Sequence, residues 1–502
     1  MSRAAGSRSP TIIVVGAGIG GLTCAIDLAI GGAKVLVLER ADGPGGKAQP
    51  VRVGGAVLDG GPTVLTMPWV FEELFATAGA SFRDEARLER AGILARHAWS
   101  DGVRLDLHAD AERSADAIGA VFGAKDARAY LAFQDDGRKL SELSEKAFLR
   151  SQRPTLVSLA RRFGPAGLAA FARMDGHRTM WRALEERFAS PRLRQLFGRY
   201  ATYVGSSPFD APATLNLIAY VESQGVYRAK DGMRGVVTAL ERLASAQGVE
   251  LRYGHAVDRV MVAGGRAVGV VAGGEEHAAD AVVFNGDVSA FAGGLLGERC
   301  SSAASATAPR ARSFSAVTWT MVGKAAGFPL LHHNVFFSDD YPSEFEELLR
   351  DRRVPSEPTV YVCAQDRGDA ADDRVEDERF LVVVNAPATG DDASRWGEQE
   401  RTRCTSVTMA LLRRTGLELT PTSSIQTTPV EFHRRFPATG GALYGPRSTG
   451  AMAALSRTGA TSALPGLYLA GGSVHPGAGV PMAGLSGRLA AAQIREDLGS
   501  TA

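Results

Sequence analysis

Fully apolar runs near both ends of the chain predict short buried strands, each next to a helix. Residues 12–15 are aliphatic, a helical pattern follows from about 20 to 30, and residues 34–38 form a second apolar run. A helix between two such runs is typical of a β-α-β unit with a parallel sheet. The chain ends on the same pattern, with an apolar run at 467–470 and a helix expected over 481–498.

The long middle of the chain predicts a second, inserted domain. From about 81 to 229 the apolar spacing is mostly helical, and after residue 300 strands and helices mix. Between these segments, a helix from about 232 and strands to 284 return to the β-α-β pattern. We therefore expect an α/β fold with a discontinuous Rossmann-like dinucleotide-binding domain and an inserted α+β substrate domain. The expected ranges are 9–80, 230–300 and 440–502 for the first, and 81–229 and 301–439 for the second.

A glycine turn stands between the first strand and the first helix. Gly16, Gly18 and Gly21 fit the pattern G-x-G-x-x-G, with Gly20 beside them. These glycines allow a tight turn, close approach of a pyrophosphate, and packing of the helix on the strand, while the helix N-terminus attracts the phosphates. Glu39 ends the second strand, where a carboxylate accepts hydrogen bonds from ribose hydroxyls and disfavours a 2′-phosphate. The turn predicts dinucleotide binding.

Two further loops favour FAD over NAD. Residues 43–47 form a second glycine turn that carries Gly46 and Lys47, a cation that can face the pyrophosphate. Residues 59–63 read DGGPT, a loop suited to close backbone approach through Gly61, Pro62 and Thr63. FAD lies extended and needs such additional contacts. A solvated lysine and an ordinary turn remain the alternatives.

The C-terminal run from 466 to 487 is the most specific feature. A strand leads into Gly472-Ser473, then His475, and then Gly479-Val480-Pro481-Met482. Pro481 suits the first turn of a helix. The dipole of that helix would stabilise the negative charge that a flavin pyrimidine ring gains on reduction.

Together these segments resemble the bacterial carotenoid desaturases of the phytoene desaturase type, within the amine-oxidase-like FAD family, over nearly the whole chain. Finer features make the likeness greatest to the 1-hydroxycarotenoid 3,4-desaturases, also called methoxyneurosporene or hydroxyneurosporene desaturases. These are FNGDVSA (284–290), AVTW (316–319), HHNVFFS (332–338), EPTVYVCAQDR (357–367), FPATGGALYG (436–445) and AGGSVHPGAGVPMAGLSGR (470–488). Many members of the wider family have Gly-Asp where Gly472-Ser473 stands here, which puts a carboxylate contact to the cofactor at that point in doubt.

The resemblance implies FAD-dependent formation of a C3–C4 double bond in a 1-hydroxy- or 1-methoxy-carotenoid, with a hydride passed to flavin N5. The expected cofactor contacts are Gly16, Gly18, Gly20, Gly21, Glu39, Arg40, Gly46, Lys47, Gly61, Pro62, Thr63, Val257, Gly472, Ser473, Gly479, Val480, Pro481 and Met482. No base is evident. His475 and Asp136 are weak candidates, with loop fixing and a solvated helix face as their alternatives.

Other activities stay open at this point. A phytoene desaturase, a carotenoid isomerase or an amine oxidase could share this fold. A non-catalytic isoprenoid-binding protein of the GDP-dissociation-inhibitor type could share the architecture too. Such inhibitors have lost the flavin-binding signature that this chain retains. An amine oxidase is expected to have an aromatic cage at the flavin, whereas the loop here contains Gly and Pro.

Composition limits which ligands and partners the sequence supports. The 502 residues carry a net charge of +1, which gives no argument for nucleic acid. The four cysteines lie far apart without metal spacing and are expected to be free thiols in a reducing cytoplasm. His332 and His333 are adjacent and cannot both face one metal easily, so we expect no metal. No run resembles a membrane span. The oligomeric state stays open.

Charge is uneven, with eleven arginines against three acids between residues 150 and 199. Apolar residues separate the arginines over 154–188, a composition typical of an interfacial amphipathic segment. A carotenoid resides in the bilayer, so we expect a cytoplasmic protein that docks peripherally on the inner membrane. Packed lid helices with solvated charges are the alternative.

Overall fold

The computed structural model describes residues 8–152, 175–370, 376–450 and 453–499. A five-stranded parallel sheet, in the order β19-β13-β1-β2-β9, forms the centre of the first domain. Its strands come from three distant segments of the chain. They are β1 (Thr11–Val15), β2 (Lys34–Leu38), β9 (Glu250–Arg252), β13 (Ala281–Phe284) and β19 (Leu467–Leu469). The predicted strand and helix pattern at both chain ends is confirmed.

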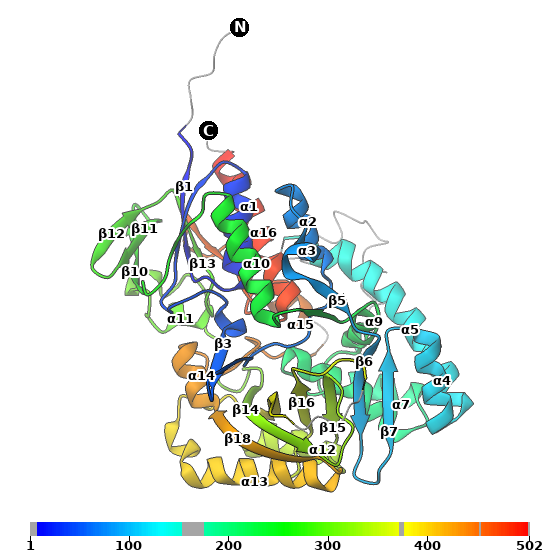
Figure 1. The fold of residues 1–502 in the computed structure, drawn as a ribbon. Helices are drawn as coiled ribbons and strands as arrows, with labels where there is room; N and C mark the ends of the chain where they lie inside the picture. Colours follow the sequence, from blue (N-terminus) through cyan, green and yellow to red (C-terminus); the bar gives the residue numbers. More distant parts are fainter. Residues whose placement is uncertain (1–7, 153–174, 371–375, 451–452, 500–502) are drawn as a thin grey trace.

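The two faces of this sheet are covered differently. On one face lie α1 (Ile19–Ile30), α10 (Met233–Ala246) and α16 (Val480–Gly499), which Figure 1 shows side by side. Val14 and Val283 point into the core that these helices share. The other face, with Ile13 and Val282, packs against a three-stranded sheet. Its strands are β10 (Val257–Ala263), β11 (Arg266–Ala272) and β12 (Glu275–Ala278).

A seven-stranded mixed sheet, in the order β18-β14-β17-β16-β15-β6-β7, forms the second domain, in the lower half of Figure 1. Its strands are β6 (Ile93–Ala98), β7 (Arg104–His108), β14 (Ser315–Ala326), β15 (His333–Phe336), β16 (Val360–Ala364), β17 (Glu378–Ala386) and β18 (Glu418–Thr427). The helices around it are α4 (Ala111–Phe122), α5 (Ala124–Ser144), α7 (Met180–Arg187), α8 (Pro191–Gly198), α9 (Leu217–Ser223), α12 (Tyr341–Glu346), α13 (Glu398–Arg414) and α14 (Pro429–Arg435).

Residues 81–229 are mostly helical, as expected, and strands β6 and β7 are an addition that the sequence did not predict. β6 pairs in parallel with β15, which lies more than two hundred residues further along the chain. Because the pairing partner is so distant, local spacing gives no sign of it. Leu105 and Leu107 of β7 fill the core beneath α4 and α5. The helices of this segment thus cover a sheet rather than form a bundle.

Short elements join the two domains. The hairpin β3 (Pro50–Val53) and β4 (Ala56–Asp59) contacts β14 and β17, and Gln365 exchanges two hydrogen bonds of 2.9 Å with the backbone of Asp59. The remaining elements are α2 (Trp69–Thr77), α3 (Phe82–Ala86), β5 (Leu88–Arg90), β8 (Tyr227–Ala229), α11 (Ser289–Ala292) and α15 (Ala453–Ser456).

The four cysteines are free, as expected, and all four are buried. Among the described residues, no helix is both long and apolar enough to cross a bilayer.

Candidate functional site

The glycine turn between β1 and α1 is held against Asn285, which follows β13. Gly16 adopts φ +100°, and its carbonyl accepts a 3.1 Å hydrogen bond from Asn285 Nδ2. A Cβ at Gly18 would lie 2.9 Å from the same nitrogen, and a Cβ at Gly21 would lie 2.1 Å from the Gly16 carbonyl oxygen. Every larger residue would therefore open the turn. Sequence reasoning missed Asn285, because its partner in the turn is 269 residues away.

The N-termini of α1 and α16 meet at this turn. A Cβ at Gly20 would lie 2.9 Å from the Ala483 carbonyl oxygen, and one at Gly487 would lie 2.1 Å from the Gly20 carbonyl oxygen. Ser486 Oγ accepts a 2.7 Å bond from the Gly471 amide, which fastens the strand before the loop. Two helix N-termini thus present unpaired N–H groups to one region, which suits an anionic, phosphate-bearing ligand.

The carboxylate of Glu39 closes the other side of the turn. Glu39 is 8% exposed, and its two oxygens accept bonds from the amides of Ala17 (2.8 Å) and Ala41 (2.9 Å). A carboxylate has about four acceptor positions, so each oxygen can still receive a ribose hydroxyl. The structure therefore places the Glu39 carboxylate beside the turn. Its contact with the ribose hydroxyls stays a prediction. Arg40, next to it, is exposed, and Val257 begins β10 two residues after His255, whose amide binds the Glu39 carbonyl at 2.8 Å.

Lys47 has a hydrogen-bond partner within the protein. Its ammonium group donates a 2.6 Å bond to the Leu443 carbonyl and lies 5.3 Å from the centre of the Phe436 ring. Burial lowers the pKa of Lys47, with Asp287 opposing that effect. The lysine thus ties its glycine turn to the 436–445 loop. The pyrophosphate contact suggested by the sequence for its ammonium group stays a prediction. Gly61 lies close against the backbone of Lys47, since a Cβ at Gly61 would lie 2.0 Å from the Lys47 carbonyl oxygen.

The C-terminal loop is held by a buried arginine. Arg457 is 6% exposed and donates to the carbonyls of Gly472 (3.0 Å), Tyr444 (3.1 Å) and Pro446 (3.0 Å). Burial lowers its pKa to about 10. Ser473 is 5% exposed. Sequence reasoning missed Arg457, which lies outside every glycine motif. By holding three carbonyls, it fixes the loop that leads to Gly479, Val480, Pro481 and Met482 at the start of α16.

His475 joins its loop to residues 148–151 through hydrogen bonds. It is 3% exposed, and its Nε2 lies 3.1 Å from the carbonyl oxygens of both Phe148 and Ser151. The Phe148 ring stands edge-on to the imidazole, with ring centres 4.6 Å apart. A nitrogen between two carbonyls must carry a proton and donate it, so Nε2 is not available as a base. The arrangement matches the loop-fixing alternative.

Asp136 does not reach this region. It lies exposed on α5 and pairs with Lys139 (3.8 Å) and with Arg187. We therefore assign it no catalytic role. Arginines nearby are neutralised in the same way, since Arg150 pairs with Glu73 and Glu145, and Arg192 pairs with Asp101. The arginines of the proposed docking segment, Arg161, Arg162 and Arg173, lie outside the described residues.

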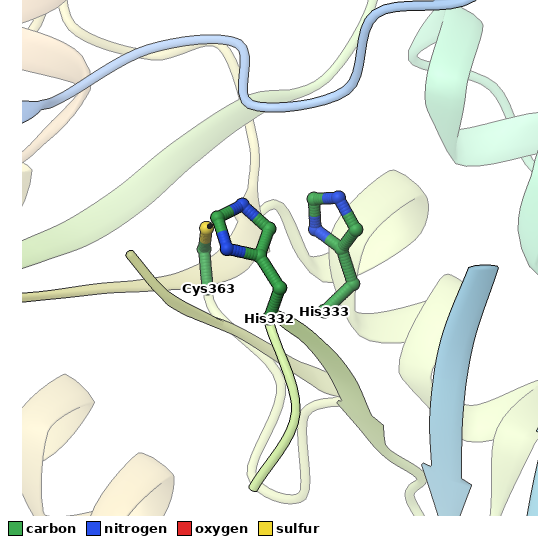
Figure 2. A group of neighbouring side chains, drawn as sticks. All are labelled: His332, His333 and Cys363. Atoms are coloured by element: carbon green, nitrogen blue, oxygen red, sulfur yellow. Dashed lines mark hydrogen bonds between the residues drawn. The ribbon is translucent and has the colours of Figure 1, made fainter. Parts of the chain in front are cut away.

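Three possible metal ligands meet at one place, against the expectation from sequence. Figure 2 shows the rings of His332 and His333 side by side, with the Cys363 sulfur beside His332. Their ligand atoms lie within 4.8 Å of one another. His333 pairs with Cys363 across β15 and β16, which puts both side chains on one face of the sheet. No ion is needed to explain the 3.6 Å between Cys363 Sγ and His332 Nε2, which suits a thiol hydrogen bond.

A cavity of about 350 Å³ opens between the two domains, where β4 meets the start of α10. Its walls carry charged residues, among them Asp59, Asp231 and Arg379. Asp59 also accepts a 2.8 Å bond from the Met233 amide at the start of α10. Charged walls do not suit a polyene, which has no group to satisfy them. This cavity is a polar seam between the domains.

The comparisons indicate a flavoprotein. The family model of flavin-containing amine oxidoreductases matches residues 19–495. The chain is 50% identical over 498 residues to the hydroxyneurosporene desaturase of Rubrivivax gelatinosus, covering 98% of this chain and 95% of that protein. It is 42% identical to the hydroxyneurosporene desaturase of Cereibacter sphaeroides, with 98% of each chain covered.

Solved structures share the fold at low identity. An oxidoreductase from Methanosarcina mazei aligns with a TM-score of 0.58 at 18% identity, covering 97% of this chain and 100% of that one. Putrescine oxidase aligns with a TM-score of 0.57 at 16% identity, covering 97% and 99%. These neighbours and the family match establish a Rossmann-like flavin-binding domain with a second domain attached to it.

Proposed function

Since the chain belongs to the family of flavin-containing amine oxidoreductases, we propose that it forms the C3–C4 double bond of carotenoids that carry a 1-hydroxyl or 1-methoxyl group. FAD is its cofactor, and the chain is an FAD oxidoreductase. The observation that carries the substrate proposal is the 50% identity to a hydroxyneurosporene desaturase across 98% of the chain. A phytoene desaturase or an isomerase of the same family is less favoured, and so is a non-catalytic isoprenoid-binding protein.

The residues proposed to hold FAD divide along its length. Glu39 accepts the ribose hydroxyls, and the turn from Gly16 to Gly21 receives the pyrophosphate at the start of α1. The loop from Gly479 to Met482 turns the start of α16 toward the flavin ring, with Gly61, Pro62 and Thr63 on the facing side. Lys47 acts through its bond to Leu443, which joins the glycine turn to the 436–445 loop.

FAD, when bound, supplies the two-electron oxidation by accepting a hydride. Two C–H bonds of neighbouring carbons break, one hydrogen leaving as a hydride and the other as a proton, and the carbon–carbon double bond forms. The chain's own task is to hold those two carbons at the cofactor and to keep water away. Neither Asp136 nor His475 Nε2 is placed to take the proton, so we propose no protein base.

The function is tested under anaerobic conditions, where one turnover needs no further electron acceptor. The purified holoenzyme is mixed with liposomes that contain a 1-hydroxylated carotenoid, the same carotenoid without the hydroxyl group, or phytoene. We expect flavin bleaching with the hydroxylated carotenoid and one new double bond per flavin, measured by chromatography. Activity on phytoene alone would refute the substrate assignment. Tight carotenoid binding without bleaching by any of the three would favour the non-catalytic alternative.

We also propose that the protein docks peripherally on a membrane surface. A carotenoid partitions into the bilayer at about 0.8 kcal/mol per buried CH₂, so the enzyme must collect it there. The apolar and arginine-rich composition of residues 154–188 supports docking through this segment. Replacing Arg161, Arg162 and Arg173 with Glu should abolish co-sedimentation with anionic liposomes. The same change at the exposed Arg242, Arg259 and Arg299 of the cofactor domain is the control. Equal binding of both triple variants would contradict docking through 154–188.

A further inference from the structure

Tyr361 is the centre of a polar group on the face of the second sheet that meets the cofactor domain. Its hydroxyl lies 2.7 Å from Thr63 Oγ1 and 2.7 Å from His333 Nδ1. Thr63 ends the DGGPT loop of the cofactor domain, whereas His333 and Tyr361 stand on the neighbouring strands β15 and β16. The three side chains therefore join the loop assigned to the flavin with the sheet assigned to the substrate.

Arg199 completes this group. Its guanidinium lies 5.6 Å from the centre of the Tyr361 ring and 5.3 Å from that of Tyr203, and it donates a 3.2 Å bond to the Tyr203 hydroxyl. Among the described residues, this is the one hydrogen bond of its side chain. A guanidinium has five donors and stays protonated, so most of its donors are left for another acceptor. The side chain is only partly buried.

The group lies between the two loops that are assigned to the flavin. On one side, Thr63 follows Gly61, which abuts the Lys47 carbonyl. On the other side, Tyr444 packs against Gly205 at the end of the turn that begins with Arg199. The next residue, Gly445, is so close to Ser473 that a Cβ would lie 2.8 Å from the Ser473 Cα. A ligand touching Arg199 and Tyr361 would therefore lie close to the flavin ring.

His333 also has an unused polar atom. Among the described residues, its Nε2 has no hydrogen-bond partner, although the side chain is 4% exposed. The neighbouring His332 is different, because its Nδ1 binds the Arg367 carbonyl at 2.9 Å and its Nε2 binds the Cys363 thiol (Figure 2). Burial raises the pKa of Cys363 to about 12 and lowers that of His332 to about 4, so both are neutral. This pairing already accounts for two of the three possible metal ligands.

We propose that Thr63, Arg199, His333 and Tyr361 form a subsite for the oxygen on C1 of the carotenoid. The inference rests on the proposed function. The oxygen is three bonds from C3 and four bonds from C4, so it lies within about 5 Å of both reacting carbons and must be bound next to the flavin. The rest of the polyene offers no polar atom. Arg199 donates to the oxygen of either a hydroxyl or a methoxyl group. In the tautomer whose Nδ1–H donates to the Tyr361 hydroxyl, which in turn donates to Thr63, His333 Nε2 accepts from a hydroxyl group alone.

This subsite positions the substrate and selects the bond. When Arg199 binds the oxygen, C3 and C4 are fixed at the cofactor. A carotenoid without the oxygen lacks this contact, so its position along the binding site is not fixed. Leaving a buried donor unpaired is costly, and sites built to bind a hydroxyl group discriminate strongly against analogues that lack it. We expect wild-type kcat/KM to fall about 100-fold or more when the hydroxyl group is replaced by hydrogen, and about ten-fold for the methoxyl group.

The variants Arg199→Met and Tyr361→Phe test the subsite in the full-length holoenzyme. For the 1-hydroxylated carotenoid, Arg199→Met should lower kcat/KM about 100-fold and Tyr361→Phe about ten-fold. For the deoxy carotenoid, which has no oxygen to lose, the loss should be at least ten-fold smaller with Arg199→Met and clearly smaller with Tyr361→Phe. Tyr468→Phe is the matched control, since its hydroxyl binds Asp497 (2.6 Å) near the C-terminal end of α16, whereas the start of that helix is assigned to the flavin. Flavin content by absorbance shows that each variant is folded and loaded.

The outcomes separate this inference from the proposed function. If wild-type enzyme acts on the 1-hydroxylated carotenoid but the variants lose activity equally on both carotenoids, the function stands and the subsite is wrong. Equal wild-type kcat/KM for the hydroxylated and deoxy substrates would also overturn it, whatever the variants do. A stoichiometric zinc ion in the purified protein that is lost in Cys363→Ser would assign His333 Nε2 to a metal and refute the subsite. If wild-type enzyme oxidises no carotenoid, the proposed function itself fails.

Discussion

The side-chain amide of Asn285 binds the carbonyl of Gly16 at 3.1 Å and thereby fastens the end of β13 to the glycine turn. The same amide fills the space that side chains at the other glycines would need. A Cβ would lie 2.8 Å from Asn285 Oδ1 at Gly20 and 2.9 Å from it at Gly471. Asn285 is thus the common neighbour of the α1 turn and of the strand that leads to α16. One polar side chain sets the shape of the region that we propose receives the pyrophosphate.

Replacing this amide should weaken FAD binding. In Asn285→Leu the Gly16 carbonyl loses its partner and the branched side chain presses on the glycines. An unpaired buried acceptor costs about 1–2 kcal/mol, so we expect the Kd for FAD to rise about five- to thirty-fold. Titration of the apoprotein by flavin fluorescence measures this. Asn216→Leu makes the same change in the second domain and should keep the wild-type affinity. Unchanged affinity in Asn285→Leu would show that the turn does not depend on this bond.

Contact between α1 and α16 should depend on Gly487. A Cβ there would lie 2.1 Å from the Gly20 carbonyl oxygen and 2.3 Å from Thr23 Oγ1, so Gly487→Ala must push the helices apart. We expect a loss of stability of about 1–3 kcal/mol, as for overpacked cores, together with weaker FAD binding. Urea unfolding followed by tryptophan fluorescence measures the first effect.

Gly499 provides the matched control on the same helix. A Cβ there would meet nothing within 4 Å. Gly499→Ala should therefore be neutral or stabilising by up to about 1 kcal/mol, since alanine favours the helix. Equal stability of the two variants would mean that the helices can separate at no cost.

Local sequence was sufficient for the parts of the site that depend on neighbouring residues. The turn from Gly16 to Gly21 and the position of Glu39 follow from one strand, one helix and the next strand, so their spacing could be read directly. Asn285 and Arg457 could not be found in this way, because each binds a loop that only the folded sheet brings near it. The same limit explains Lys47, whose direction is decided by the Leu443 carbonyl, 396 residues away.

The second domain was less predictable for a related reason. Strands β6 and β7 follow a helical context in the sequence and become strands because β15 pairs with β6. Adjacent residues such as His332 and His333 are not expected to face one metal easily, yet the chain enters β15 at His333 and both rings lie near Cys363. Such groups form across strands, and the spacing along one strand does not contain them. The substrate assignment depended on resemblance throughout.

The buried ion pair between Arg367 and Glu378 should be essential for the second domain. The two side chains are 4% and 2% exposed and share two hydrogen bonds of 2.7 Å. Arg367→Met leaves a buried carboxylate without its counter-ion, which typically costs about 3–5 kcal/mol. The double variant Arg367→Met/Glu378→Leu should recover most of that loss in urea unfolding, because no charge remains buried. A double variant as unstable as the single one would show that packing, not charge, dominates there.

Protonation of Glu344 should make stability depend on pH. Glu344 is 2% exposed on α12, and burial raises its pKa from 4.5 to about 7, partly opposed by its bond from Thr359 and by Arg199. Below pH 4.5 the carboxyl group is protonated in both states and its contribution is fully present. Between the two values the folded protein binds more protons than the unfolded chain, so the free energy of unfolding falls as pH rises, by at most about 1.4 kcal/mol per pH unit.

Glu344→Gln removes this titration and keeps an acceptor for the Thr359 hydroxyl. We expect the variant to gain about 2 kcal/mol relative to wild type between pH 5 and pH 8, in urea unfolding at both values. Glu346→Gln is the control, because Glu346 lies on the same helix with 59% of its side chain exposed and pairs with Arg350. Its pH dependence should match that of wild type. If Glu344→Gln also keeps the wild-type slope, the folded protein holds Glu344 ionised near neutral pH, and Arg199 rather than burial determines its charge.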